Sequence, residues 1–172
     1  MDSDEIGAQL ERYHAESYGW ARCCCRQDPI EGENVLQTAY LKIFQRQAVF
    51  DGRSAFRTWL FSLIRNTAAE ARRRRFLSRL GLMRYRDLAP RPAQPAPENA
   101  AYLDEVQSKL RGALRDLPLR QAEVLQLVFY HELSLAEAAG VMGVSLGSAR
   151  THYARGKARL RIWAEAEGIQ VP

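Results

Sequence analysis

The chain has 172 residues, of which 47% are hydrophobic, and its formal net charge is +5. This length allows one ordinary domain or two small ones, and this hydrophobic content permits a core in each half. The acidic start lacks the apolar segment of a secretory signal, and no apolar run approaches transmembrane length, so we expect a cytoplasmic protein without direct membrane insertion.

The charges are unevenly distributed along the chain. Residues 53–91 hold eleven basic and two acidic side chains, and residues 150–172 hold five basic and two acidic ones. Residues 1–52 and 92–149 are acidic overall. Basic segments favour a polyanionic partner, which leaves the acidic segments available to face a protein.

Apolar periodicity predicts three helices in the N-terminal part. The first spans about Glu5–Arg26 and the second about Glu33–Gln47, with Pro29 between them. Ser54 is expected to cap a long third helix, which continues into the arginine run at residues 72–75.

The three cysteines, Cys23, Cys24 and Cys25, are contiguous. On a helix such neighbours point about 100° apart and cannot converge on one metal ion. We therefore expect partly buried thiols in a reducing compartment. The alternative is a thiol sensor, or a metal site that also uses His14.

Prolines divide the chain. Four of the seven lie between Ala89 and Glu98, where they prevent a helix and favour an extended linker. We expect an N-terminal domain at residues 1–85, a linker at 86–100 and a C-terminal domain at 101–172. In the last, helices are predicted at Ala101–Asp116 and Leu119–Tyr130. No strand alternation is visible, so the predicted class is all-α: two small helical bundles joined by a Pro-rich linker.

A helix-turn-helix is predicted between residues 134 and 157. Ser134 and Glu137 have the spacing of a capping box, Gly143 can end the first helix with positive φ, and Ser145 can cap the second. The second helix is basic, which favours DNA binding. Paired short helices also occur in all-α proteins that bind no nucleic acid.

A further motif runs from Phe50 through Trp59 to Asn66 and ends in the arginine run. At this point the sequence resembles the extracytoplasmic-function (ECF) sigma factors. The segment 50–75 is similar to their regions 2.3 and 2.4, residues 34–41 to region 2.2, and residues 117–125 and 133–157 to region 4. The three motifs occur in the family's order, around a linker.

The resemblance implies a transcription initiation factor that binds core RNA polymerase and promoter DNA. It would bind the −10 element as single strand through its first domain and the −35 element as duplex through its second. It also implies an anti-sigma protein as a partner, and it implies no catalytic activity, no cofactor, no metal and no small-molecule substrate.

The −10 interface would combine a small pocket for a flipped base with cations for phosphates. Loop 50–54 and one helical asparagine supply the pocket, and arginines supply the charge. The predicted residues are Asp51, Gly52, Arg53, Ser54, Arg57, Arg65, Asn66, Arg72 and Arg73.

In the recognition helix, Arg150 can donate to guanine edges, while neighbouring polar side chains contact bases or phosphates. The predicted −35 residues are Ser148, Arg150, Thr151, Arg155 and Lys157.

The resemblance places polymerase binding on region 2.2. The family usually has an acidic residue where this chain has Asn34, so the chain departs from the pattern there, whereas Gln37 matches it. The predicted polymerase-binding residues are Asn34, Gln37, Tyr40 and Leu41.

Two other classes of function compete. A conventional helix-turn-helix regulator explains residues 134–157 but not residues 50–75. An all-α enzyme or scaffold with an incidental turn would explain neither, and the sequence has no Gly-rich phosphate loop, nucleophile elbow or metal-ligand cluster.

Overall fold

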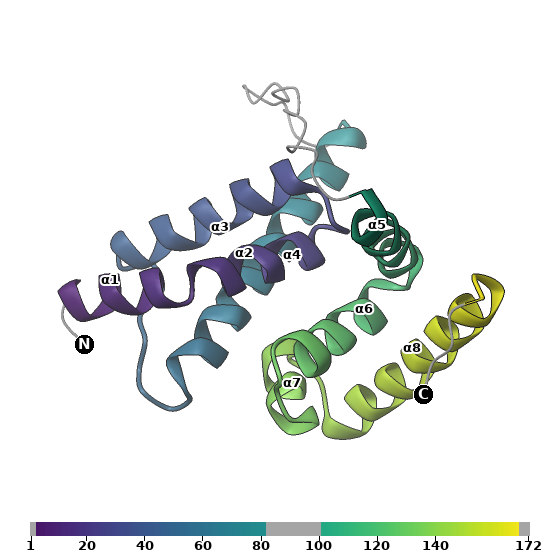
Figure 1. Ribbon diagram of the computed structural model, residues 1–172. Helices are drawn as coiled ribbons and strands as arrows, with labels where there is room; N and C mark the ends of the chain where they lie inside the picture. The colour runs from purple at the N-terminus through teal and green to yellow at the C-terminus, as the bar shows by residue number, and fades with distance from the viewer. Residues whose placement is uncertain (1–2, 82–100, 169–172) are drawn as a thin grey trace.

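The computed structural model describes residues 3–81 and 101–168 (Figure 1). The predicted linker, residues 86–100, lies outside this part of the chain. The described residues form helices and no β-strand, which confirms the all-α class. The elements are α1 (Ser3–Arg12), α2 (His14–Cys24), α3 (Pro29–Phe44), α4 (Phe56–Arg79), α5 (Ala101–Asp116), α6 (Leu119–Leu125), the π-helix η1 (Gln126–Tyr130), α7 (Leu135–Met142) and α8 (Leu146–Ala166).

None of the helices in the described ranges has the length and apolar character that a bilayer crossing requires.

Helices α2, α3 and α4 pack together as an N-terminal bundle. Helix α3 starts earlier than expected because Pro29 occupies its first turn and the Asp28 carboxylate accepts hydrogen bonds from the backbone N–H groups of Ile30 and Glu31, both at 3.0 Å. Gly32 of α3 lies against α2, where an added Cβ would be 3.0 Å from backbone atoms of Arg22.

Two helix starts differ from the sequence predictions. The first predicted helix is interrupted at Tyr13, whose φ of −99° and ψ of 8° lie outside the helical region. Ser54 does not cap α4, because Ala55 is the N-cap residue and the Ser54 hydroxyl instead donates to the Ala55 carbonyl at 3.3 Å. Phe56 begins α4 within an aromatic cluster, and this packing stabilises the first turn in place of a capping side chain.

The C-terminal bundle contains α5 to α8 and the predicted helix-turn-helix. The capping box at Ser134 and Glu137 is present, Gly143 has φ 62°, and the Ser145 side chain accepts from the backbone of Ser148. These three predictions are confirmed. Each satisfies backbone groups that the helix ends would otherwise leave unpaired, so the turn has a defined geometry.

The helix predicted at Leu119–Tyr130 changes character in its second half. Helix α6 ends at Leu125, and the next five residues form η1, in which the N–H of His131 donates to the carbonyl of Gln126 at 3.1 Å. A π-turn contains one residue more than an α-turn spanning the same rise, and it is frequent at functional sites. Here it directs Leu127 and His131 inward, while Phe129 and Tyr130 face solvent.

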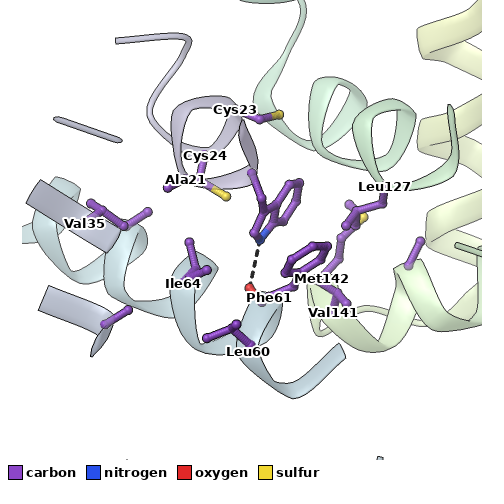
Figure 2. Packing of buried hydrophobic residues seen from close by; sticks show 14 of the residues in the cluster. Ala21, Cys23, Cys24, Val35, Leu60, Phe61, Ile64, Leu127, Val141 and Met142 are labelled. Atoms are coloured by element: carbon purple, nitrogen blue, oxygen red, sulfur yellow. Dashed lines mark hydrogen bonds between the residues drawn. The ribbon is translucent and has the colours of Figure 1, made fainter. Parts of the chain in front are cut away.

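The two bundles pack against each other, and their buried apolar residues form one continuous cluster. Trp20 of α2 and Phe61 of α4 are fully buried, and the Trp20 indole donates to the Phe61 carbonyl at 2.9 Å, drawn as the dashed line in Figure 2. Figure 2 also shows Phe61 directed toward Leu127 and Met142 of the C-terminal bundle.

Candidate nucleic-acid and polymerase-binding surfaces

Helix α8 presents the predicted −35 residues to solvent. All five are exposed, whereas Ala149 and Gly156 are buried against the rest of the C-terminal bundle. An added Cβ at Gly156 would be 2.9 Å from the side chain of Leu125, so α8 and α6 approach closely there. The exposed face of α8 is thereby held on a rigid support. The five residues are Ser148, Arg150, Thr151, Arg155 and Lys157.

These residues form two stripes rather than one. At 3.6 residues per turn, Ser148 and Arg155 share one side of α8, Arg150 and Lys157 share another side about 160° away, and Thr151 lies between the two. Small residues that the sequence analysis did not single out, Gly147, Ala154 and Ala158, are exposed between the stripes. The helix therefore offers a central face of small side chains and Thr151, with longer basic side chains on either side.

Loop 50–54 lies over the start of α4. Phe50 anchors it, with ring centroids 5.3 Å from Phe56 and 5.4 Å from Trp59. Beyond this anchor the loop is exposed, and Gly52 has φ 76°, a conformation that glycine adopts without strain. Asp51 and Arg53 form an ion pair at 3.2 Å, so the loop contains both a donor and an acceptor group.

Asn66 is exposed on α4, but it does not lie beside loop 50–54. Ten residues separate it from Phe56, which corresponds to about 15 Å along a helix. The loop and Asn66 therefore lie at successive positions along α4 and not in one pocket. Arg73, farther along the same helix, is also exposed.

Three of the predicted −10 arginines are engaged inside the molecule. Arg57 pairs with Glu16 at 2.7 Å and donates to the carbonyl of His131 at 2.6 Å. Arg65 is buried and pairs with Glu123. Arg72 donates to the carbonyl of Cys24 at 2.7 Å. In this arrangement Arg65 cannot contact a phosphate.

The predicted polymerase-binding residues follow one side of α3. Asn34, Gln37 and Leu41 are exposed, and Tyr40 is half-buried with its hydroxyl 3.3 Å from His14. Phe44, which the sequence analysis missed, continues this surface and is 59% exposed. The i, i+3, i+7 spacing with an apolar end could have identified it. An amphipathic face of this kind suits a protein partner better than a phosphate.

The cysteines do not form a reactive or metal-binding group. Burial is the main cause that raises the pKa of Cys23 and Cys24, and it raises that of Cys25 to about 11. Reactive thiols need a lowered pKa. In the described ranges, no group of three or more His, Cys, Asp or Glu side chains is placed to hold a metal ion.

Each of the two bundles matches a known protein family model. Residues 10–76 match the family model for sigma-70 region 2, and residues 107–160 match that for sigma-70 region 4. The "ECF RNA polymerase sigma factor SigL" of Mycobacterium tuberculosis (strain H37Rv) is 30% identical over 164 residues, covering 92% of this chain and 85% of that protein. SigX of Bacillus subtilis is 27% identical over 154 residues, covering 88% and 79%.

Solved structures share the fold. The sigma factor RpoE in complex with the anti-sigma factor NepR from Bartonella quintana superposes with a TM-score of 0.69 at 21% identity, covering 94% of this chain and 97% of that one. CnrH in complex with the cytosolic domain of CnrY gives a TM-score of 0.66 at 21% identity, covering 96% and 90%.

A region 2 bundle followed by a region 4 helix-turn-helix defines a sigma-70-type transcription initiation factor, a binding protein and not an enzyme. Within that class, the chain belongs to the ECF RNA polymerase sigma factors. The match to region 2 excludes a conventional helix-turn-helix regulator, because such a protein has no counterpart of residues 10–76.

Proposed function

We propose that the protein acts in the cytoplasm as the promoter-binding subunit of RNA polymerase, with its tasks divided among three surfaces. Helix α8 binds the −35 element, loop 50–54 with α4 binds the −10 strand, and the exposed side of α3 binds the core enzyme. The residue sets are those predicted from the sequence, with Phe44 added to the α3 surface.

The observation that supports this proposal most directly is the arrangement of α8. The major groove is about 12 Å wide and accepts one α-helix, provided that the helix can approach its floor. The small residues Gly147, Ala154 and Ala158 permit that approach. Arg150 and Arg155, on the two flanking stripes, can then reach base edges or phosphates on opposite sides of the groove.

The −10 assignment is supported by the exposure of loop 50–54, Asn66 and Arg73 on one continuous motif. Single-stranded DNA is held by a cationic track together with groups that accept unstacked bases. The aromatic anchor at Phe50 keeps the loop in place, so that its polar groups are positioned before a strand arrives.

We also propose that an anti-sigma protein regulates this factor. The support is that the two structural neighbours were both solved with such partners, NepR for RpoE and the cytosolic domain of CnrY for CnrH. With two domains, at residues 1–85 and 101–172, an anti-sigma protein that contacts both could control whether they separate.

The test is transcription in vitro with purified core polymerase and a pool of genomic promoter fragments. The full chain is expected to bind core enzyme and to produce discrete start sites that core enzyme alone does not produce. Mapped transcripts would be aligned to find a shared −35 and −10 pair. Binding to core enzyme without any gain in start-site selectivity would contradict the proposed function.

A further inference from the structure

The interface between the two bundles has an apolar centre. Phe61 of α4 and Trp20 of α2 meet the imidazole of His131, with ring centroids 4.6 Å and 6.2 Å away, respectively. Leu127 of η1 and Met142 of α7 complete the contact, and all five side chains are almost fully buried. We call this contact, together with the Arg65–Glu123 ion pair and the Arg57–His131 hydrogen bond, the inter-bundle clasp.

A buried ion pair lies beside this apolar centre. Arg65 Nε on α4 is 3.1 Å from Glu123 Oε1 on α6. Glu123 is fully buried and Arg65 is 8% exposed, while Glu123 Oε2 has no hydrogen-bond partner. A buried pair contributes little net stability, but the removal of one partner strands the other charge in a medium of low polarity. The pair therefore favours the docked arrangement in which Arg65 and Glu123 are in contact over any arrangement that separates them.

Arg57 forms the second polar contact across the interface. Its Nη2 donates to the carbonyl of His131 at 2.6 Å across the interface, and it also pairs with Glu16 of α2, within its own bundle, at 2.7 Å. Arg57, Phe61 and Arg65 follow at i, i+4 and i+8, so they share one face of α4. The C-terminal bundle covers that face.

The same face contains two of the residues assigned to the −10 strand. A phosphate cannot bind Arg65 while Glu123 does, and at Arg57 it would have to displace the His131 carbonyl and compete with the Glu16 carboxylate. The docked bundles also cannot reach both promoter elements, which lie about 25 base pairs or about 85 Å apart on B-DNA. A compact chain of 172 residues has a radius of gyration of about 16 Å.

We propose that the free factor inhibits itself: its C-terminal bundle covers the Arg57–Phe61–Arg65 face of α4, and the −10 strand competes with Glu123 and His131 for the two arginines. This inference rests on the proposed function, because it takes that face of α4 to be the one that binds DNA. Promoter binding then requires the clasp to open, and the apparent affinity for single-stranded DNA is reduced by the fraction of closed molecules.

The test compares Glu123→Gln with Glu165→Gln in the full chain. Both substitutions remove one negative charge, but Glu165 is exposed near the end of α8, away from the clasp. Small-angle scattering measures the radius of gyration, and titration of a fluorescent random-sequence single-stranded DNA pool measures affinity. We expect Glu123→Gln to be measurably larger than wild type and to bind DNA at least about tenfold more tightly, since it removes the negative charge that neutralises the buried Arg65. Glu165→Gln should match wild type in size.

A double variant tests the same contact if Glu123→Gln fails to fold. Apolar replacement of a buried pair is usually tolerated, so R65M/E123L should fold and return to the compact size of wild type. A wild type as extended as Glu123→Gln, or equal DNA affinities for Glu123→Gln and Glu165→Gln, would overturn the clasp. Failure of every variant to support transcription with core enzyme would instead contradict the proposed function, whatever the scattering shows.

Discussion

His131 occupies a site that does not favour a charged imidazole. It is fully buried among aromatic rings, and neither ring nitrogen has a hydrogen-bond partner. Burial first, and the nearby Arg57 guanidinium second, lower its pKa from the usual 6.5 to about 4. Glu16 Oε2 is 3.6 Å from Nδ1, but the same oxygen already pairs with Arg57 at 2.7 Å.

The lowered pKa makes the docked state sensitive to acid. A group whose pKa is depressed on docking destabilises that state as the pH falls below the undocked value, here from about 6.5 toward 4. Between pH 7 and pH 5 we expect the free energy that stabilises the docked state to fall by about 2 kcal/mol because of His131. Thermal unfolding and scattering at both pH values would measure it.

The matched variant for this prediction is His131→Phe, which fits the aromatic surroundings and cannot be protonated. This substitution should remove most of the loss of stability that His131 causes between pH 7 and pH 5. The pH dependence that remains would come from the carboxylates. An identical pH dependence in wild type and His131→Phe would show that His131 does not titrate with docking.

Arg150 is suited to a test of the −35 surface, because its side chain is exposed on α8 and its removal should leave the fold intact. Arg150→Ala should weaken −35-dependent initiation by about 1–3 kcal/mol if the guanidinium donates to both acceptors of a guanine. The measurement is run-off transcription from matched promoters with intact and mutated −35 sequences. Equal use of both promoters by the wild-type factor would count against this role.

At the scale of elements, the close crossing of α2 and α3 depends on Gly32. An added Cβ would lie 2.8 Å from Arg22 Cγ and 3.0 Å from its backbone N and Cα, and backbone atoms cannot rotate away. We expect Gly32→Ala to lower the free energy of unfolding by about 1–3 kcal/mol, the usual cost of overpacking. Chemical denaturation would measure the change.

The control for this prediction is Gly140→Ala in α7. Nothing lies within 4 Å of an added Cβ there, so the substitution should stabilise the protein by about 0.5–1 kcal/mol through the higher helix propensity of alanine. The two variants carry the same chemical change with opposite expected signs. A shared sign would indicate that the crossing of α2 and α3 is not tightly packed.

The elements that could be predicted from the sequence are those with local signals. The capping box at Ser134, the left-handed Gly143 and the cap at Ser145 each depend on residues within four positions of one another. The break at Tyr13 and the π-turn of η1 could not be predicted, because neither coincides with a glycine or proline. Both occur where the chain packs against distant segments, and tertiary contacts determine the backbone there.

At the scale of the whole molecule, the docking of the two bundles had no counterpart in the sequence patterns. Arg65 and Glu123 are 58 positions apart, and nothing local to either residue identifies the other. The basic segment 53–91 predicted a polyanion partner, and Arg73 remains exposed for one. Charge counts along a chain cannot separate the arginines that face solvent from those that face a second bundle.

Cysteine alkylation can report the separation of the bundles. Figure 2 shows the Cys23 thiol pointing toward the C-terminal bundle and that of Cys24 pointing into the N-terminal core. Both are almost fully buried, whereas Cys25 is partly exposed. In wild type, Cys25 should react first, since a thiol must become accessible before its thiolate can form and attack.

Glu123→Gln should accelerate alkylation of Cys23 by about tenfold or more while leaving Cys24 slow, because opening the clasp exposes the former and only loss of the N-terminal core exposes the latter. Peptide mass spectrometry after timed quenching would give each rate. Parallel acceleration at Cys23 and Cys24 would indicate general unfolding of the N-terminal bundle.

The π-turn of η1 has a consequence for anyone who recombines sigma factor modules. It introduces one additional residue just ahead of the helix-turn-helix. Deletion of one residue among Gln126–Tyr130 would rotate the following side chains by about 100° relative to the preceding helix. His131 would then leave its aromatic cage. A chimaera that transplants this −35-binding module should therefore keep the five-residue turn intact, together with the N-terminal surface against which it fits.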